Sequence, residues 1–166
     1  MHLAERAYFL IVATAILAIA GLWTSDQAVA GMWHWPAALL LLGLAGEALF
    51  IRKVVIHADV DTDTRALLGR AQPAAFTFQS RARRTLRIEF APVMPTGFEA
   101  LQATRRLAVP GVGVVRDSFA LVPLRLGPRS WPALPLRILG AAGLAWWSRE
   151  LAVVKNIAVV PDVSHL

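Results

Sequence analysis

Two long apolar segments near the N-terminus constrain this chain more than any other feature. The first runs from Ala7 to Trp23 without a charge, and the second runs from Met32 to Ile51 with Glu47 as its one charged residue. As helices they would be roughly 25 and 30 Å long, which matches the thickness of a bilayer's hydrocarbon core. The link at residues 24–31 is short enough to make the helices antiparallel. Residues 1–53 are therefore predicted to form a transmembrane helical hairpin.

Aromatic and basic residues predict how this hairpin would be oriented. Trp23, Trp33 and Trp35 flank the link, as expected for rings that lie at a membrane–water interface. Arg6 and the pair Arg52-Lys53 lie at the opposite end. Because basic residues favour the cytoplasmic side, we expect a multi-pass protein of the plasma membrane with both termini in the cytoplasm.

A cleaved signal peptide is the alternative for residues 1–30. Arg6, the apolar core and the small-residue sequence Ala28-Val29-Ala30 fit such a segment. However, the apolar core is longer than the 7–15 residues usual in signal peptides, and a second span follows almost at once. The uncleaved hairpin is favoured, and both interpretations leave Arg52-Lys53 in the cytoplasm.

Glu47 is the ionisable residue inside a predicted span. An acid within a membrane segment suggests a proton or ion relay, and therefore a transport or enzyme component. Glu47 also lies about one turn from the cytoplasmic end, level with Arg6 on the antiparallel neighbour, where it could pair with that arginine. A single acid on two helices makes no relay chain, so we favour a Glu47 that either extends to the interface or pairs with Arg6.

The overall composition separates a membrane part from a basic part. Hydrophobic residues make up 57% of the 166-residue chain and charged residues only 17%, against roughly 25% charged in soluble domains. This excludes intrinsic disorder, and the lack of cysteine excludes disulfides and thiolate chemistry. The net charge of +6 is unevenly placed, since from residue 52 onwards sixteen basic side chains stand against eight acidic ones.

From Val54 onwards the apolar pattern has the period of two that is typical of strands. Residues 75–79 and 86–90 alternate on either side of a basic segment, which predicts a β-hairpin with a basic tip. Further strands are expected at 100–107, 117–126, 134–139 and 157–160, and 141–155 carries a weak helical pattern. Residues 54–166 are therefore predicted to form an all-β, β-sandwich-like domain.

Several short motifs follow one another in a recognisable order after the two spans. They are Phe76–Phe90 (strand, turn, strand), Met94–Glu99, Leu124–Pro128, Leu136–Trp146 and Val159–Val163. In this order the chain resembles the domain-of-unknown-function family fifty-eight, whose members are bacterial membrane proteins encoded beside MoxR-type AAA+ ATPases. The resemblance implies a bacterial inner-membrane location and a downstream von Willebrand factor A-like domain, so the chain is expected to be the N-terminal part of a longer protein.

Short motifs that suggest metal or catalytic chemistry are incomplete in this sequence. The run Asp59–Asp63 begins like an EF-hand loop, but Thr64 and Arg70 stand where glycine and glutamate are required. The four histidines are scattered and no nucleophile elbow is present. We therefore expect no cofactor, no metal and no catalytic residues.

Arg81, Arg83, Arg84 and Arg87 form the densest basic cluster. It could be plain solvated surface, a contact with anionic lipid, or a contact with a protein partner. Nucleic acid is disfavoured as a partner because Phe76, Phe78 and Phe90 alternate into the expected core instead of lying among the arginines.

These observations, together with the resemblance, lead to one functional hypothesis and two alternatives. The hypothesis is a membrane-anchored, non-catalytic scaffold or adaptor that acts with a MoxR-type AAA+ ATPase in protein maturation or assembly. The alternatives are a membrane transport or enzyme component that uses Glu47, and an anionic-lipid-binding domain that uses the Arg81–Arg87 cluster.

Overall fold

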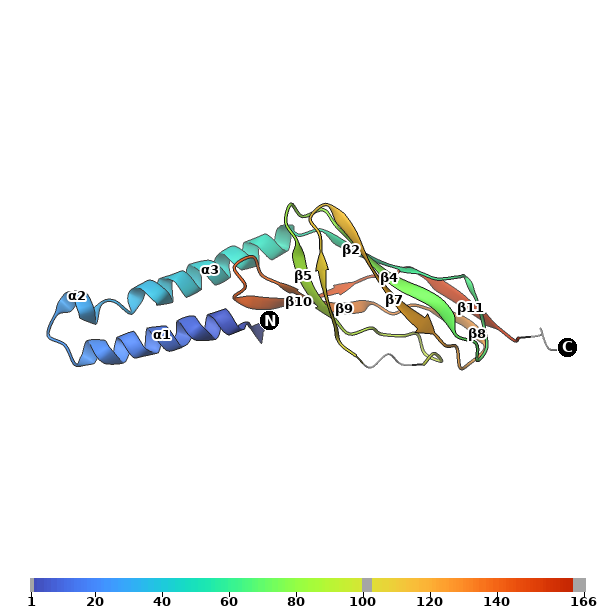
Figure 1. The fold of residues 1–166 in the computed structure, drawn as a ribbon, viewed down its shortest axis with the longest axis horizontal. Coiled ribbons are helices and arrows are strands. Elements are labelled where there is room, and N and C mark those ends of the chain that lie inside the picture. Colours follow the sequence, from blue (N-terminus) through green and yellow to red (C-terminus); the bar gives the residue numbers. More distant parts are fainter. Residues whose placement is uncertain (1, 100–102, 163–166) are drawn as a thin grey trace. The chain divides into compact units, whose positions relative to one another are not determined.

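The structure is a computed structural model that describes residues 2–99 and 103–162 (Figure 1). Its contacts divide the chain into two compact units. The first comprises the chain up to Val54 together with Ile138–Trp147, and the second comprises Val55–Arg137 together with the chain from Ser148 onwards. Each unit is therefore built from segments that lie far apart in the sequence.

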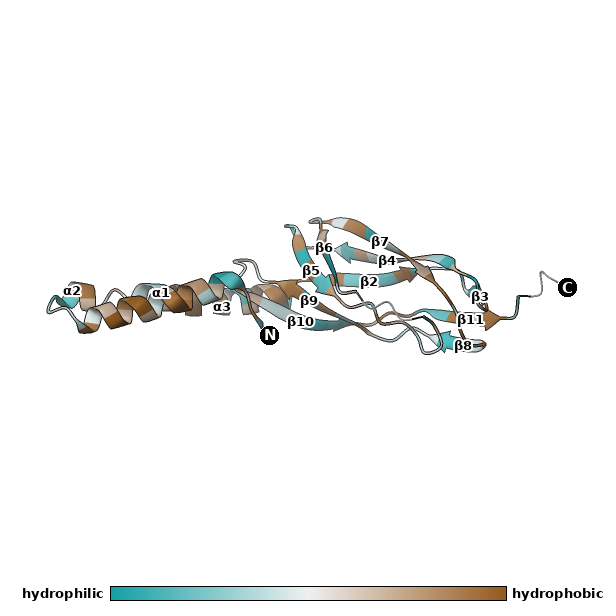
Figure 2. Ribbon diagram, turned by 60° about the horizontal axis from the view of Figure 1, so that its bottom comes forward, coloured by the Kyte–Doolittle hydropathy of each residue, from teal (hydrophilic) through white to brown (hydrophobic). Residues whose placement is uncertain are grey.

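The first unit contains the two apolar helices that the sequence predicts. They are α1 (Glu5–Leu22) and α3 (His34–Lys53), and the short helix α2 (Gln27–Ala30) lies in the link between them. The carboxylate of Asp26 caps α2 by accepting a hydrogen bond from the N–H of Ala28. By length and composition, α1 and the segment Gln27–Lys53 could each cross a membrane. Figure 2 shows apolar residues along both helices.

A short strand at the N-terminus completes this unit. Strand β1 (His2–Leu3) pairs antiparallel with the first residues of β10 (Ala145–Leu151), so that His2 lies opposite Trp146. The N–H of Ala4 then donates to the carbonyl of Leu144. The start of α1 is therefore hydrogen-bonded to a segment about 140 residues later in the sequence, which no local pattern predicts.

The second unit is mostly β-sheet, as predicted. One sheet has the order β2-β4-β7 and another has the order β3-β11-β8, in which β11 pairs parallel with β3 and antiparallel with β8. The remaining strands belong to a five-stranded sheet with the order β1-β10-β9-β5-β6, of which β1 and part of β10 and β9 belong to the first unit. The bounds are β2 (Ile56–Asp61), β3 (Arg65–Leu67), β4 (Gln72–Ser80), β5 (Leu86–Phe90), β6 (Arg105–Val109), β7 (Gly113–Leu121), β8 (Gly127–Ser130), β9 (Leu134–Leu139) and β11 (Asn156–Val160).

Aromatic side chains from facing strands form the core of this unit. Phe76 and Phe78 of β4 contact Phe90 of β5, with ring centroids 5.6 and 4.8 Å apart. On its other side Phe76 stacks on Phe119 and meets Trp131 edge-on. The prediction that the three phenylalanines alternate into the core is confirmed, since all three are buried.

The predicted hairpin over residues 75–90 is wrong. Strand β4 pairs with β2 and β7, whereas β5 belongs to the five-stranded sheet, so residues 81–85 cross from one sheet to another. Alternation places the phenylalanines of both strands toward the core. It therefore looks the same whether two strands pair side by side or face one another across a core.

The other predicted strands fall close to observed ones. The range 134–139 coincides with β9, and 157–160 lies within β11. The strands predicted at 100–107 and 117–126 overlap β6 and β7 with shifted ends, and residues 100–102 lie outside the described residues. The weak helical pattern at 141–155 is wrong, because this range contains strand β10.

Candidate functional site

The carboxylate of Glu47 accepts four hydrogen bonds within the first unit. Its Oε1 accepts hydrogen bonds from the backbone N–H groups of Ala142 (3.0 Å) and Leu144 (2.8 Å). Its Oε2 accepts from the N–H of Ala145 (3.0 Å) and from the indole Nε1–H of Trp147 (3.4 Å). Glu47 is only 1% exposed. A buried carboxylate is stable here because each oxygen faces two donors.

The segment that surrounds Glu47 is the turn at residues 140–145 between β9 and β10. The N–H of Gly140 donates to the carbonyl of Ala145, which closes the turn, and Gly143 has a φ of +73°. Gly140 lies against the carboxyl group so closely that a Cβ atom at this position would collide with it. The glycines therefore serve two purposes, which are a left-handed turn at Gly143 and close approach at Gly140.

Arg6 contacts the same turn from α1. Its Nη1 donates to the carbonyl of Ala142 at 3.2 Å. The sequence predicts a pair between Arg6 and Glu47, and the structure brings both residues to one turn. Among the described residues, however, Glu47 accepts only from N–H groups of residues 142–147, and no ion pair joins it to Arg6. The turn, rather than an ion pair, links the two residues.

This coordination suits a structural role for Glu47. An ionised carboxylate only accepts hydrogen bonds, and the structure gives both of its oxygens N–H donors. The sequence could not identify these donors, because they lie 95 to 100 residues later in the chain. The motif Leu136–Trp146, singled out for its family resemblance, does contain most of them.

The predicted membrane-interface residues gather at the two ends of the helices. Trp23 caps the C-terminus of α1, and Trp33 precedes α3 and stacks on His34 with ring centroids 3.8 Å apart. Trp35 is exposed in the first turn of α3. Arg52 and Lys53 are exposed in its last turn.

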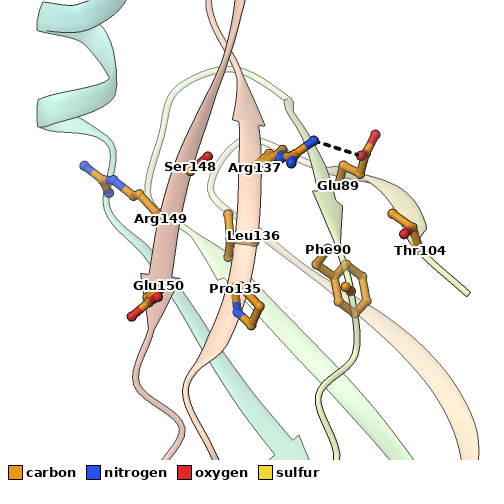
Figure 3. Close-up of a pocket in the computed structure, with 10 residues that line it drawn as sticks. Glu89, Phe90, Thr104, Pro135, Leu136, Arg137, Ser148, Arg149 and Glu150 are labelled. Carbon is orange, nitrogen blue, oxygen red and sulfur yellow. Dashed lines mark ion pairs between the residues drawn. The ribbon is translucent and has the colours of Figure 1, made fainter. Parts of the chain in front are cut away.

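A pocket of about 480 Å³ lies in the second unit, and no sequence pattern predicts it. Its polar lining includes Glu89, Thr104, Arg137, Ser148, Arg149 and Glu150 (Figure 3). Glu89 of β5 accepts a hydrogen bond from Arg106 at 2.8 Å and faces Arg137 of β9 at 3.9 Å. Alternation along each strand predicts that Glu89 and Arg137 point away from the core. It does not predict that β9 and β5 are neighbouring strands, which is what brings the two side chains together.

The pocket offers charged groups of both signs and two hydroxyl groups. Such a lining can bind charged and polar side chains of a polypeptide. Among residues 2–99 and 103–162, no group of three or more His, Asp or Glu side chains could hold a metal ion. The Arg81–Arg87 cluster is exposed on the segment that crosses from β4 to β5 and continues into β5.

Comparisons with known proteins find little similarity. No family model and no curated protein matches the chain. Similar solved structures include a crystal structure of the CARDB domain of a Pyrococcus furiosus protein, in complex with di-metal ions. That structure has a TM-score of 0.44 and 5% identity, over 66% of this chain and 96% of that one. A solution NMR structure of the same domain has a TM-score of 0.43 and 6% identity, over 63% and 94%. Similarity this distant carries no functional assignment.

Proposed function

We propose that the chain is a membrane-anchored, non-catalytic scaffold or adaptor. The observation that carries the proposal is the exposure of large apolar side chains along α1 and α3, including Phe9, Ile16, Leu22, Leu39, Leu42 and Leu49. Transfer of one such side chain from water to an apolar phase is worth about 1.5–3 kcal/mol. The summed preference of two such helices for lipid supports a hairpin that spans the membrane.

The flanking residues support a single orientation of this hairpin. Trp23, Trp33 and Trp35 would lie at one interface, and Arg6, Arg52 and Lys53 at the other. The proposed location is the bacterial inner membrane, with two spans and with both termini in the cytoplasm.

The pocket supports the adaptor part of the proposal. Its charged groups of both signs suit the charged and polar side chains of a second polypeptide. The partner that we propose is a MoxR-type AAA+ ATPase, as the family resemblance implies.

Site-specific cross-linking in the native membrane tests this partner. A photoactivatable residue would replace Ser148, which lines the pocket, and the matched control would replace Ser118, an exposed serine on β7. We expect a cross-linked AAA+ ATPase at position 148 and none at position 118. Equal cross-linking at both positions, or no ATPase at either, would contradict the proposed partner.

A further inference from the structure

Two loops of the second unit meet at one end of its sheets. The N–H of Val112, in the connection from β6 to β7, donates to the carbonyl of Ala82 at 2.9 Å. Beside it, the backbone of Gly111 packs so closely on Arg83 that an added Cβ would lie 2.8 Å from the carbonyl carbon of Arg83. The pairing of β4 with β7 also brings the two loops together, since Ser80 at the end of β4 lies opposite Gly113 at the start of β7. We call the residues Arg81, Arg83, Arg84, Arg87 and Val112 the Arg–Val tip.

The charge at this end has one sign. The residues that surround the two loops, at 55–57, 79–88 and 109–115, include four arginines and no acidic residue. All four arginines are exposed. The nearest acid along β5 is Glu89, which already accepts a hydrogen bond from Arg106. This end of the second unit therefore has a positive surface potential, which attracts anionic groups.

An apolar side chain projects among these arginines. Val112 is 76% exposed and has a φ of +50°, a conformation that β-branched residues rarely adopt. Its hydrogen bond to Ala82 helps to hold it there. The exposed Val114 follows on β7. Arginines around a projecting aliphatic side chain combine the two interactions that bind interfacial segments to anionic membranes.

The chain path links the Arg–Val tip to the end of α3. The N–H of Arg81 donates to the carbonyl of Val55 at 3.2 Å. Val55 follows the last residue of α3, Lys53, by two positions, which is a reach of at most about 7 Å. If α3 ends at the cytoplasmic interface, as proposed, chain length alone keeps Val55 close to the lipid headgroups. The backbone of Arg81, which is hydrogen-bonded to Val55, is then close to them as well.

We propose that the Arg–Val tip binds the anionic headgroups of the cytoplasmic leaflet, with Val112 inserted at the interface. This inference rests on the proposed membrane anchoring and adds the second unit as a lipid-binding part. Each arginine near an anionic surface favours association with it, and the tether keeps the domain close to the leaflet. Protein or nucleic-acid binding by the same arginines would need no insertion of Val112.

The absence of cysteine from the sequence gives a direct test on the full chain. Three single-cysteine variants would carry an environment-sensitive fluorophore, namely V112C, V154C and L41C. Val154 is 91% exposed on the β10–β11 connection, and Leu41 is 68% exposed on α3. Each labelled chain would be reconstituted into phosphatidylcholine vesicles with and without phosphatidylglycerol. Nitroxide lipids would then quench at headgroup or acyl depth.

We expect headgroup-depth quenching at position 112 only with phosphatidylglycerol, little quenching at 154, and acyl-depth quenching at 41 in both lipids. In the V112C background, R81Q/R83Q should lower the ratio of docked to undocked domain roughly 30-fold, from two contributions of about 1 kcal/mol. The control R65Q/R70Q removes two exposed arginines outside the tip and should change little.

The outcomes separate the two proposals. Deep quenching at 41 without quenching at 112 would overturn lipid binding by the tip and leave the anchor intact. Quenching at 112 that ignores phosphatidylglycerol, or equal effects of the two arginine pairs, would also overturn it. No acyl-depth quenching at 41 would contradict the anchor itself.

Discussion

Glu47 uses its full capacity as a hydrogen-bond acceptor to hold a turn formed by residues near the other end of the chain. Each carboxylate oxygen accepts from two N–H donors. Of these four donors, three are backbone groups of residues 142–145. Because those groups are part-buried or buried, removal of their acceptor leaves them without a partner at a cost of about 1–3 kcal/mol each. The stability of the turn should therefore depend on this one side chain.

The substitution Glu47→Gln tests that dependence. An amide keeps one oxygen and turns an NH₂ group toward two of the donors, so we expect the turn to open more often. Hydrogen exchange at the amides of Ala142, Leu144 and Ala145 should accelerate roughly 30-fold, corresponding to about 2 kcal/mol. Glu5→Gln, at an exposed position in α1, is the matched control. Unchanged exchange in Glu47→Gln would show that the carboxylate does not hold the turn.

Two glycines provide a second test of the same contact. In Gly140→Ala the new methyl group would collide with the Glu47 carboxyl group, so we expect a lower melting temperature of the full chain in detergent. Gly46→Ala has nothing within 4 Å of the new methyl group and lies inside α3. It should raise stability by about 1 kcal/mol through helix propensity. Equal melting temperatures for the two variants would contradict the close approach at Gly140.

At this scale, the sequence predicts which residue is special but not what it binds. Glu47 stands out because it is an acid in an apolar helix, and Arg6 donates to the carbonyl of Ala142 in the turn that binds Glu47. The donors come from a turn whose sequence, Gly140–Ala145, is small and apolar. Backbone N–H groups belong to every non-proline residue, so nothing in the sequence distinguishes those that will become donors.

Among the secondary-structure elements, apolar periodicity predicts strands well and their pairing poorly. The strands predicted at 86–90 and 134–139 match β5 and β9 to the residue, since alternation depends only on which side chains face the core. The pairing of β4 with β2 and β7 depends on how two sheets stack, and the residues 81–85 between β4 and β5 look like any hairpin turn. Alternation therefore cannot predict which sheet each strand joins.

Disulfide cross-linking distinguishes the two pairings. Gln79 lies opposite Val114 across β4 and β7, whereas a hairpin that closes over residues 81–85 would place Gln79 opposite Arg87. Directly opposed residues have Cβ atoms about 4.5–5.5 Å apart, within reach of a disulfide. Under mild oxidation, Q79C/V114C should form an intrachain disulfide and Q79C/R87C should not. The reverse result would restore the hairpin.

For the whole molecule, the predicted arrangement of two apolar helices followed by a mostly β domain agrees with the structure, because long apolar runs and period-two alternation are strong signals. The division into units was not predicted. Ile138–Trp147, expected within the β domain, groups with the helices instead. This grouping follows from contacts of Glu47, Arg6 and β1 with the turn, all of which join residues distant in sequence.

The membrane orientation of the helices is the central claim, and cysteine accessibility tests it most directly. Because the chain has no cysteine, S25C in the link between the helices and S118C on β7 give unambiguous labelling sites. In intact spheroplasts, a membrane-impermeant maleimide should label S25C at once and S118C only after detergent is added. Labelling of S118C in intact spheroplasts, or loss of S25C from the mature chain, would contradict an uncleaved hairpin whose β domain lies in the cytoplasm.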